Sequence, residues 1–126
     1  MGFLRPWEGM IYAVMRILVG LLFMEHGLQK ILGMFGGPPP GMPGLLLYLS
    51  GTIELLGGLL VAIGFQAALA AFICSGTMAV AYFMAHAPRG FFPIENRGEL
   101  AILYCWIFLL IAGRGAGRFS IDGERR

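Results

Sequence analysis

The sequence predicts an all-α integral membrane protein, a bundle of four membrane-spanning helices in a single domain covering residues 1–126. The chain is 58% hydrophobic and only 13% charged, whereas a soluble domain carries about 25% charged residues. Its mean hydropathy is +0.78. Long apolar runs alternate with short polar or glycine- and proline-rich stretches, which predicts spans at about residues 10–33, 45–63, 67–85 and 97–113.

The first predicted helix, residues 10–33, is long enough to cross a bilayer, yet it contains Arg16, Glu25, His26, Gln29 and Lys30. These polar residues interrupt the apolar run and no small-residue cleavage site follows, so we expect this helix to be retained rather than removed as a secretory signal. Three successive prolines and several glycines in residues 34–44 prevent the helix from continuing and predict a loop.

The later spans follow from the same pattern. Residues 45–63 and 67–85 are joined by a tight, charge-free connection. The purely apolar part of the fourth helix, residues 97–113, is short for a span of about 20 residues. We therefore expect that helix to include charged residues at one of its ends, with their long side chains reaching to water.

The distribution of basic residues predicts the orientation in a bacterial or archaeal plasma (inner) membrane. Four spans place both termini on one side, together with Arg5, Arg114, Arg118, Arg125 and Arg126. The other side holds Lys30, Arg89 and Arg97. Because cytoplasmic loops are enriched in Lys and Arg, we expect both termini in the cytoplasm. The formal net charge of +2 is too small to indicate a nucleic-acid partner.

Buried ionisable residues are costly in a bilayer and require partners. At 100° per residue, Arg16 and Lys30 share one face of the first helix with two glycines, and Glu54 lies among small residues of the second helix. The two helices are antiparallel, and we expect an Arg16–Glu54 ion pair. Such a pair either fixes the packing of the bundle or has a functional role.

A second group is predicted near the outer face, formed by His26, Lys30, His86 and Glu99. It would hold an anion, transfer a proton or bind a quinone carbonyl; the alternative is a solvated network at the interface. Asn96 followed three residues later by Glu99 also resembles a helix capping box. The His and acidic residues lack short ligand spacing, so we expect no metal site.

The two cysteines, Cys74 and Cys105, lie within apolar runs at similar predicted depth. We interpret both as small buried hydrophobic residues. Contact between them, and hence a redox pair, is the alternative.

The order of several short motifs resembles the DoxX family of small bacterial and archaeal membrane proteins. The resemblance covers roughly residues 10–122 and is carried by Arg16, HGLQK at 26–30, Glu54 with Gly57 and Gly58, Gly64, HAPRGFFP at 86–93, NRGE at 96–99, and the segments 115–117 and 120–122.

The resemblance implies a four-helix membrane bundle and a redox role, because the family is named after a subunit of a thiosulfate:quinone oxidoreductase and other members are linked to membrane redox and thiol-stress complexes. It implies a non-autonomous subunit with a quinone as cofactor, and a homo-oligomer or a redox partner subunit in the lipid bilayer. The chain has no C-x-x-C, haem or dinucleotide motif, so a quinone or a partner would carry the electrons. The alternatives are a small solute or proton transporter or channel, and a scaffold without ligand.

Overall fold

The computed structural model describes residues 1–124, and these residues form helices and connecting segments without a β-strand. The elements are η1 (Gly2–Trp7) and α1 (Glu8–Leu32), then α2 (Gly44–Thr52), η2 (Ile53–Gly57) and α3 (Gly58–Ile63), then α4 (Ala67–Ala81), η3 (Tyr82–His86) and η4 (Ala87–Arg89), and finally α5 (Pro93–Asn96) and α6 (Glu99–Arg114). Arg125 and Arg126, which contribute to the predicted orientation, lie outside the described residues.

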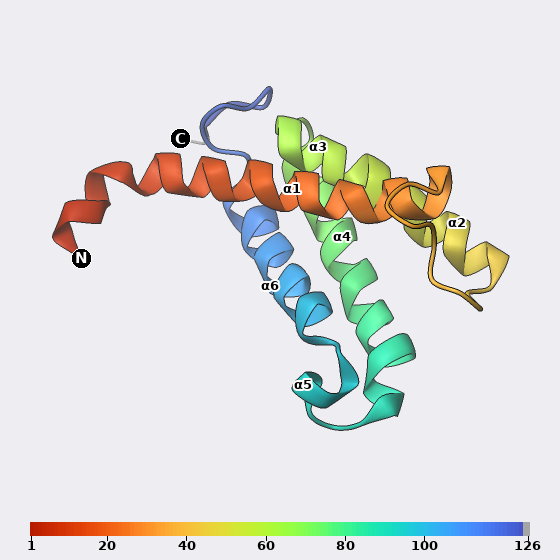
Figure 1. Cartoon of the computed structure of the whole chain (residues 1–126). Helices are drawn as coiled ribbons and strands as arrows, with labels where there is room; N and C mark the ends of the chain where they lie inside the picture. Colours follow the sequence, from red (N-terminus) through yellow and green to blue (C-terminus); the bar gives the residue numbers. More distant parts are fainter. Residues whose placement is uncertain (125–126) are drawn as a thin grey trace.

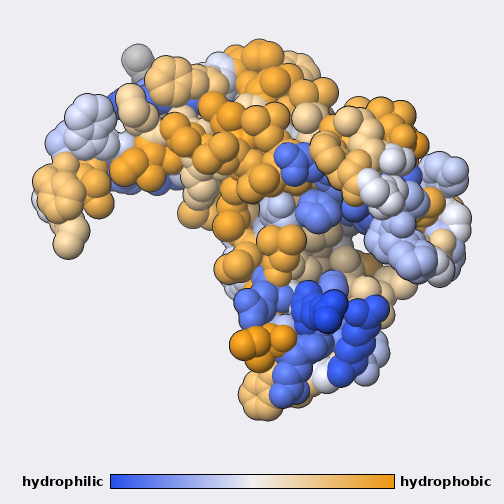
Figure 2. Space-filling view, viewed as in Figure 1, coloured by the Kyte–Doolittle hydropathy of each residue, from blue (hydrophilic) through white to orange (hydrophobic). Residues whose placement is uncertain are grey.

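The predicted class, an all-helical membrane protein, is confirmed. Three continuous helical stretches are long and apolar enough to cross a membrane, namely Gly2–Leu32, Gly44–Ile63 and Ala67–Arg89. The fourth helix, α6, has 16 residues and is therefore about 24 Å long, somewhat shorter than a hydrocarbon core of about 30 Å. Figure 2 shows apolar residues over most of the visible face, as expected for a surface in contact with lipid.

Helix α6 begins at Glu99 rather than at Arg97 because Arg97 adopts a left-handed backbone conformation with φ of 62°. The predicted capping box is wrong, since the N-cap of α6 is Gly98 and no side chain caps the helix. The Asn96 side chain instead accepts a hydrogen bond from the Gly98 amide. The helix therefore carries Glu99 at its first position and Arg114 at its last.

Glycines set the register between α1 and the antiparallel helix formed by α2, η2 and α3. A Cβ built on Gly20 would lie 2.6 Å from the Gly58 carbonyl oxygen, and one on Gly27 would lie 2.6 Å from Leu55 Cα and 2.7 Å from the Gly51 oxygen. These separations leave no space for a side chain. The helix backbones thus approach closely along two glycine contacts, as small residues allow in membrane bundles.

Two helix pairs make up the bundle (Figure 1). Helix α1 packs along α2, η2 and α3, while α4 packs along α6. The pairs are joined by aromatic contacts, with the Phe23 ring 4.7 Å from that of Phe108 and 5.1 Å from that of Tyr104. Figure 1 shows that the pairs meet on the side of the C-terminal tail and diverge toward the loop after α1 and the segment around α5.

Candidate functional site

Lys30 and Glu54 form a buried ion pair between α1 and η2. The Lys30 ammonium lies 2.7 Å from Glu54 Oε2 and also donates a hydrogen bond to Ser50 Oγ at 3.0 Å. Only 11% of the Lys30 side chain and 3% of the Glu54 side chain are exposed. The glycine contact one turn earlier, between Gly27 and the following helix, brings these two side chains within bonding distance.

The pair leaves one acceptor and one donor unused. Glu54 Oε1 is buried and has no hydrogen-bond partner among the described residues. A Lys ammonium has three N–H donors, and the hydrogen bonds of Lys30 to Glu54 and Ser50 use two of them. A buried carboxylate oxygen without a partner is unfavourable in a dry interior, so it requires an explanation in function or in a bound group.

Glu54 lies in a π-helical segment, η2, that interrupts an otherwise regular α-helix. Single-turn π-helical insertions are rare and occur frequently at functional sites. The same segment packs against α1 and α4, and a Cβ built on Gly57 would overlap the Cys74 sulfur. The π segment therefore positions Glu54 at the point where three helices meet.

The predicted Arg16–Glu54 ion pair is wrong. Lys30 follows Arg16 by 14 positions, or about 21 Å along an α-helix, and the glycine register sets Lys30 rather than Arg16 opposite Glu54. Both Arg16 and Glu54 are buried. The polar face on α1 was correctly identified, but the pairing depends on helix register, which polarity alone does not determine.

Arg16 instead binds four backbone carbonyl groups. Its Nη1 donates to the oxygens of Val61 and Ala62 at 3.0 and 3.2 Å, in the last turn of α3. Its Nη2 donates to the oxygens of Arg118 and Phe119 in the C-terminal tail at 3.0 and 2.9 Å. The last carbonyls of a helix lack partners within the helix, and the guanidinium satisfies them. Arg16 therefore fixes the tail against the bundle.

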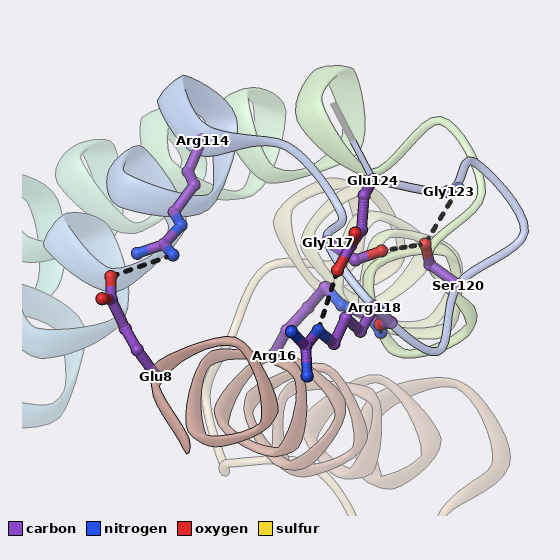
Figure 3. A network of polar contacts seen from close by, with 8 residues as sticks. All are labelled: Glu8, Arg16, Arg114, Gly117, Arg118, Ser120, Gly123 and Glu124. Atoms are coloured by element: carbon purple, nitrogen blue, oxygen red, sulfur yellow. Dashed lines mark hydrogen bonds and ion pairs between the residues drawn. The ribbon is translucent and has the colours of Figure 1, made fainter. Parts of the chain in front are cut away.

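Further polar contacts hold the two chain ends together (Figure 3). Arg114 at the end of α6 donates to Glu8 at 3.1 Å, and Arg118 donates to Glu124 at 2.9 Å. Figure 3 shows the Arg118–Glu124 pair beside Arg16, within the folded tail. These exposed pairs contribute little stability individually. The Arg114–Glu8 pair nevertheless shows that the end of α6 lies beside the start of α1, whereas the Arg118–Glu124 pair lies within the tail.

The tail also caps α4. The Asp122 carboxylate accepts hydrogen bonds from the backbone amides of Gln66 and Ala67, each at 2.9 Å. A carboxylate at this position satisfies free amides at the helix N-terminus and interacts favourably with the helix dipole. Sequence reasoning identified segments 115–117 and 120–122 only through the family resemblance. The structure adds that Asp122 caps α4 and that Arg118 and Phe119, between the two segments, bind Arg16.

The predicted cluster of His26, Lys30, His86 and Glu99 is divided in the structure. His86 Nδ1 lies 3.1 Å from the Asn96 carbonyl oxygen, and its ring stacks on Tyr82. Glu99 is exposed at the start of α6. Within residues 1–124, no hydrogen bond or ion pair joins His86 or Glu99 to Lys30 or His26. The divergence of the two helix pairs accounts for this separation.

His26 remains close to the buried ion pair. It lies one helical turn before Lys30, on an adjacent part of the same face. Its ring meets that of Tyr104 edge-on, with 6.1 Å between the centroids. His26 also lines a surface pocket of about 110 Å³ together with Glu25, Gln29 and Phe35.

The two cysteines lie in α4 and α6. Cys74 and Cys105 are both unpaired. Cys74 is fully buried beside Gly57, and the Cys105 sulfur lies 3.5 Å from Ser75 Oγ. In the part of the chain that the structure describes, no three His, Cys, Asp or Glu residues are grouped to hold a metal ion.

Comparison with known proteins agrees with a membrane protein. The family model described as DoxX matches residues 11–87. An uncharacterized protein of Haemophilus influenzae is 41% identical over 98% of this chain and 97% of its own length. Inner membrane protein YqjF of Escherichia coli is 33% identical over 94% and 95%, respectively.

A shorter match includes a redox assignment in its name. The Bacillus subtilis protein named "Putative oxidoreductase CatD" is 38% identical over 40% of this chain and 41% of its own length. No solved structure matches the chain. The family match covers more than half of the sequence, and the long relatives cover nearly all of it: this chain is a membrane protein of the DoxX family.

Proposed function

We propose that this chain is the membrane subunit of a quinone-linked or thiol/sulfur redox complex, and that the Lys30–Glu54 pair binds the quinone headgroup. The observation that carries the proposal is the unused acceptor, Glu54 Oε1, next to an ammonium with one unused donor. A quinone headgroup presents carbonyl oxygens when oxidised and hydroxyl groups when reduced. A neighbouring donor and acceptor complement both forms.

Each residue would have a defined task. The Lys30 ammonium would donate its third hydrogen bond to a headgroup oxygen. Glu54 Oε1 would accept a hydrogen bond from a hydroxyl group of the reduced quinone. Ser50 accepts a hydrogen bond from Lys30 and thereby holds the ammonium in place. The quinone, when bound, would supply the electron-transfer chemistry. Because Glu54 Oε1 is sealed from solvent, neighbouring side chains must move aside to admit the ring.

The name of the CatD relative supports a redox setting, although that match covers less than half of either protein. The sequence has no C-x-x-C or haem motif, so electrons would come from a partner subunit docked to the bundle. A homo-oligomer around the same site is compatible with this role.

The proposal is tested by calorimetric titration of a short-chain ubiquinone and of a naphthoquinone into the protein in lipid nanodiscs. Wild type should bind at least one of them. Glu54→Gln and Lys30→Ala should each weaken binding by about 10- to 150-fold, because hydrogen bonds to charged groups contribute about 1.5–3 kcal/mol.

Ser75→Ala is the matched control. It removes a buried polar group outside the proposed site, the Ser75 hydroxyl, which donates to the Cys105 carbonyl at 2.7 Å on the α4–α6 side of the bundle. This substitution should leave quinone binding unchanged. The double variant Lys30→Met/Glu54→Gln removes both charges together, which keeps the test valid if a single variant folds poorly. Failure of wild type to bind either quinone, or unaltered binding in all the Lys30 and Glu54 variants, would refute the proposal.

A further inference from the structure

The carboxylate of Glu54 is buried inside the bundle, and one ionisable side chain of the neighbouring turn of α1 reaches the surface. His26 lies one helical turn from Lys30 on α1 and also lines the surface pocket with Glu25, Gln29 and Phe35. Among the described residues, His26 is thus the ionisable side chain shared by the pocket and the surroundings of the buried pair.

The positions on α1 explain this arrangement. At 100° per residue, Lys30 and Gly27 face η2, whereas Glu25 and Gln29 point toward the side of the helix. His26 lies between these two directions, about 40° from Lys30. The Gln29 amide donates to the Phe35 carbonyl at 3.2 Å, which holds the following loop over the pocket.

We propose that the pocket formed by Glu25, His26, Gln29 and Phe35 is the opening through which buried Glu54 exchanges protons with the solution, and that His26 transfers the proton. A turn of the His26 ring or an intervening water would bring the imidazole into hydrogen-bond reach of Glu54 Oε1, which has no partner among the described residues. The neutral imidazole then accepts the proton of the Glu54 carboxyl group, giving an imidazolium and a carboxylate. The imidazolium then releases a proton from its other nitrogen to water or to the Glu25 carboxylate in the pocket. Proton uptake follows the reverse order, so the exchange needs no oxidant or reductant.

The groups facing Glu54 are compatible with this path. On α1 they are Lys30, which bonds Glu54, and His26; on the other elements they are Cys74 of α4, which lies against Gly57 of η2, and Tyr104 of α6, which contacts His26. Cys74 is fully buried and has no route to the surface. Tyr104 is also buried and contacts the His26 ring edge-on. His26, which is half-buried, is the member of this set that also reaches the pocket.

The proposal does not depend on quinone binding, and it is tested without any quinone. The protein in nanodiscs is subjected to a rapid pH jump, and the carboxyl infrared band of Glu54, assigned by its loss in Glu54→Gln, is followed in time. His26→Ala should lower the rate at which this band changes by about 100-fold or more, the range of a positioned acid–base group. The final amplitude of the change should be the same as in wild type. Added imidazole should enter the enlarged pocket and restore the rate.

His86→Ala is the matched control, since it removes the chain's other imidazole from a loop contact with Asn96 and should leave the rate unchanged. Gln29→Phe, which fills the pocket without touching the ion pair, should slow exchange in the same way and serves if His26→Ala folds poorly. Three results would overturn the proposal: a wild-type rate in both pocket variants, a slow His26→Ala rate that imidazole does not change, or a Glu54 band that does not respond to pH.

Discussion

Removing one partner of the Lys30–Glu54 pair should destabilise the protein far more than removing both. In Lys30→Met, the Glu54 carboxyl group, 3% exposed, loses its counter-charge and is left without an ionic partner in the interior. Stranding one member of a buried pair costs about 3–5 kcal/mol, and we expect this variant near the upper end. Glu54→Gln should cost about 3 kcal/mol, because Lys30 is 11% exposed and retains its hydrogen bond to Ser50.

In the double variant Lys30→Met/Glu54→Gln, no uncompensated charge remains. Replacing a buried pair by neutral residues of similar volume is often close to neutral, so the double variant should lose only about 1 kcal/mol. The stability order is therefore wild type, double variant, Glu54→Gln and Lys30→Met. The two substitutions should be strongly non-additive, as expected for residues in direct contact.

The measurement is reversible unfolding of the four proteins in mixed detergent micelles, followed by far-ultraviolet circular dichroism. A double-mutant cycle at the exposed pair Glu8–Arg114, whose side chains are 63% and 45% exposed, provides the control. The coupling energy of this pair should be less than about 1 kcal/mol. If the losses of the two single variants at Lys30 and Glu54 add up to the loss of the double variant, the buried pair does not couple and the reasoning fails.

Three further predictions follow from the helix contacts and the tail. Gly27→Leu should separate α1 from η2 and destabilise the protein by about 1–3 kcal/mol or more, since a Cβ there would lie 2.6 Å from Leu55 Cα; an unchanged unfolding midpoint would contradict the glycine register. Arg16→Gln should release the tail, which limited proteolysis would detect as cleavage after Arg118, whereas a protease-resistant tail would show that other contacts suffice. A reporter that is active only in the cytoplasm should be active when fused to either terminus, and one that is active only in the periplasm should be inactive. The opposite result at both termini would contradict the predicted orientation.

Hydropathy and charge were sufficient to predict the helices but not their partners. Long apolar runs and a proline-rich break predict the first span, and the structure begins α1 at Glu8 and ends it at Leu32. Arg16 and Glu54 are buried because a bilayer disfavours exposed charge. The partner of each residue could not be predicted from the sequence. Several antiparallel registers of the two helices place polar faces together, and only the close glycine contacts select one.

The predicted cluster of His26, Lys30, His86 and Glu99 illustrates a second limit of prediction from the sequence. His86 follows the third predicted span and Glu99 opens the fourth. The sequence predicts both on the same side as Lys30, and shared depth suggested shared contacts. The structure separates them because the α4–α6 pair diverges from α1 (Figure 1). Crossing angles between helices follow from how their side chains interlock, and this information is spread over the whole contact rather than contained in a short motif.

The two buried cations of α1 show why chemistry is assigned to one of them. Arg16 presents a planar fork of five donors and meets four carbonyl oxygens where a helix end and the tail converge. Its single unused donor, Nε, has no free acceptor beside it among the described residues. Lys30 meets one carboxylate and one hydroxyl, and the pair retains an open acceptor next to an open donor.

This difference distinguishes the structural contacts of Arg16 from the proposed binding site at Lys30 and Glu54. A ligand with both a carbonyl and a hydroxyl function gains nothing at Arg16, where the carbonyls are already bonded, but finds complementary atoms at Lys30 and Glu54. The π-helical turn supports the same conclusion, because it places Glu54 at a three-helix junction. The C-terminal end of α1, rather than the end that lies beside the chain termini, is therefore where substitutions should alter function before they alter the fold.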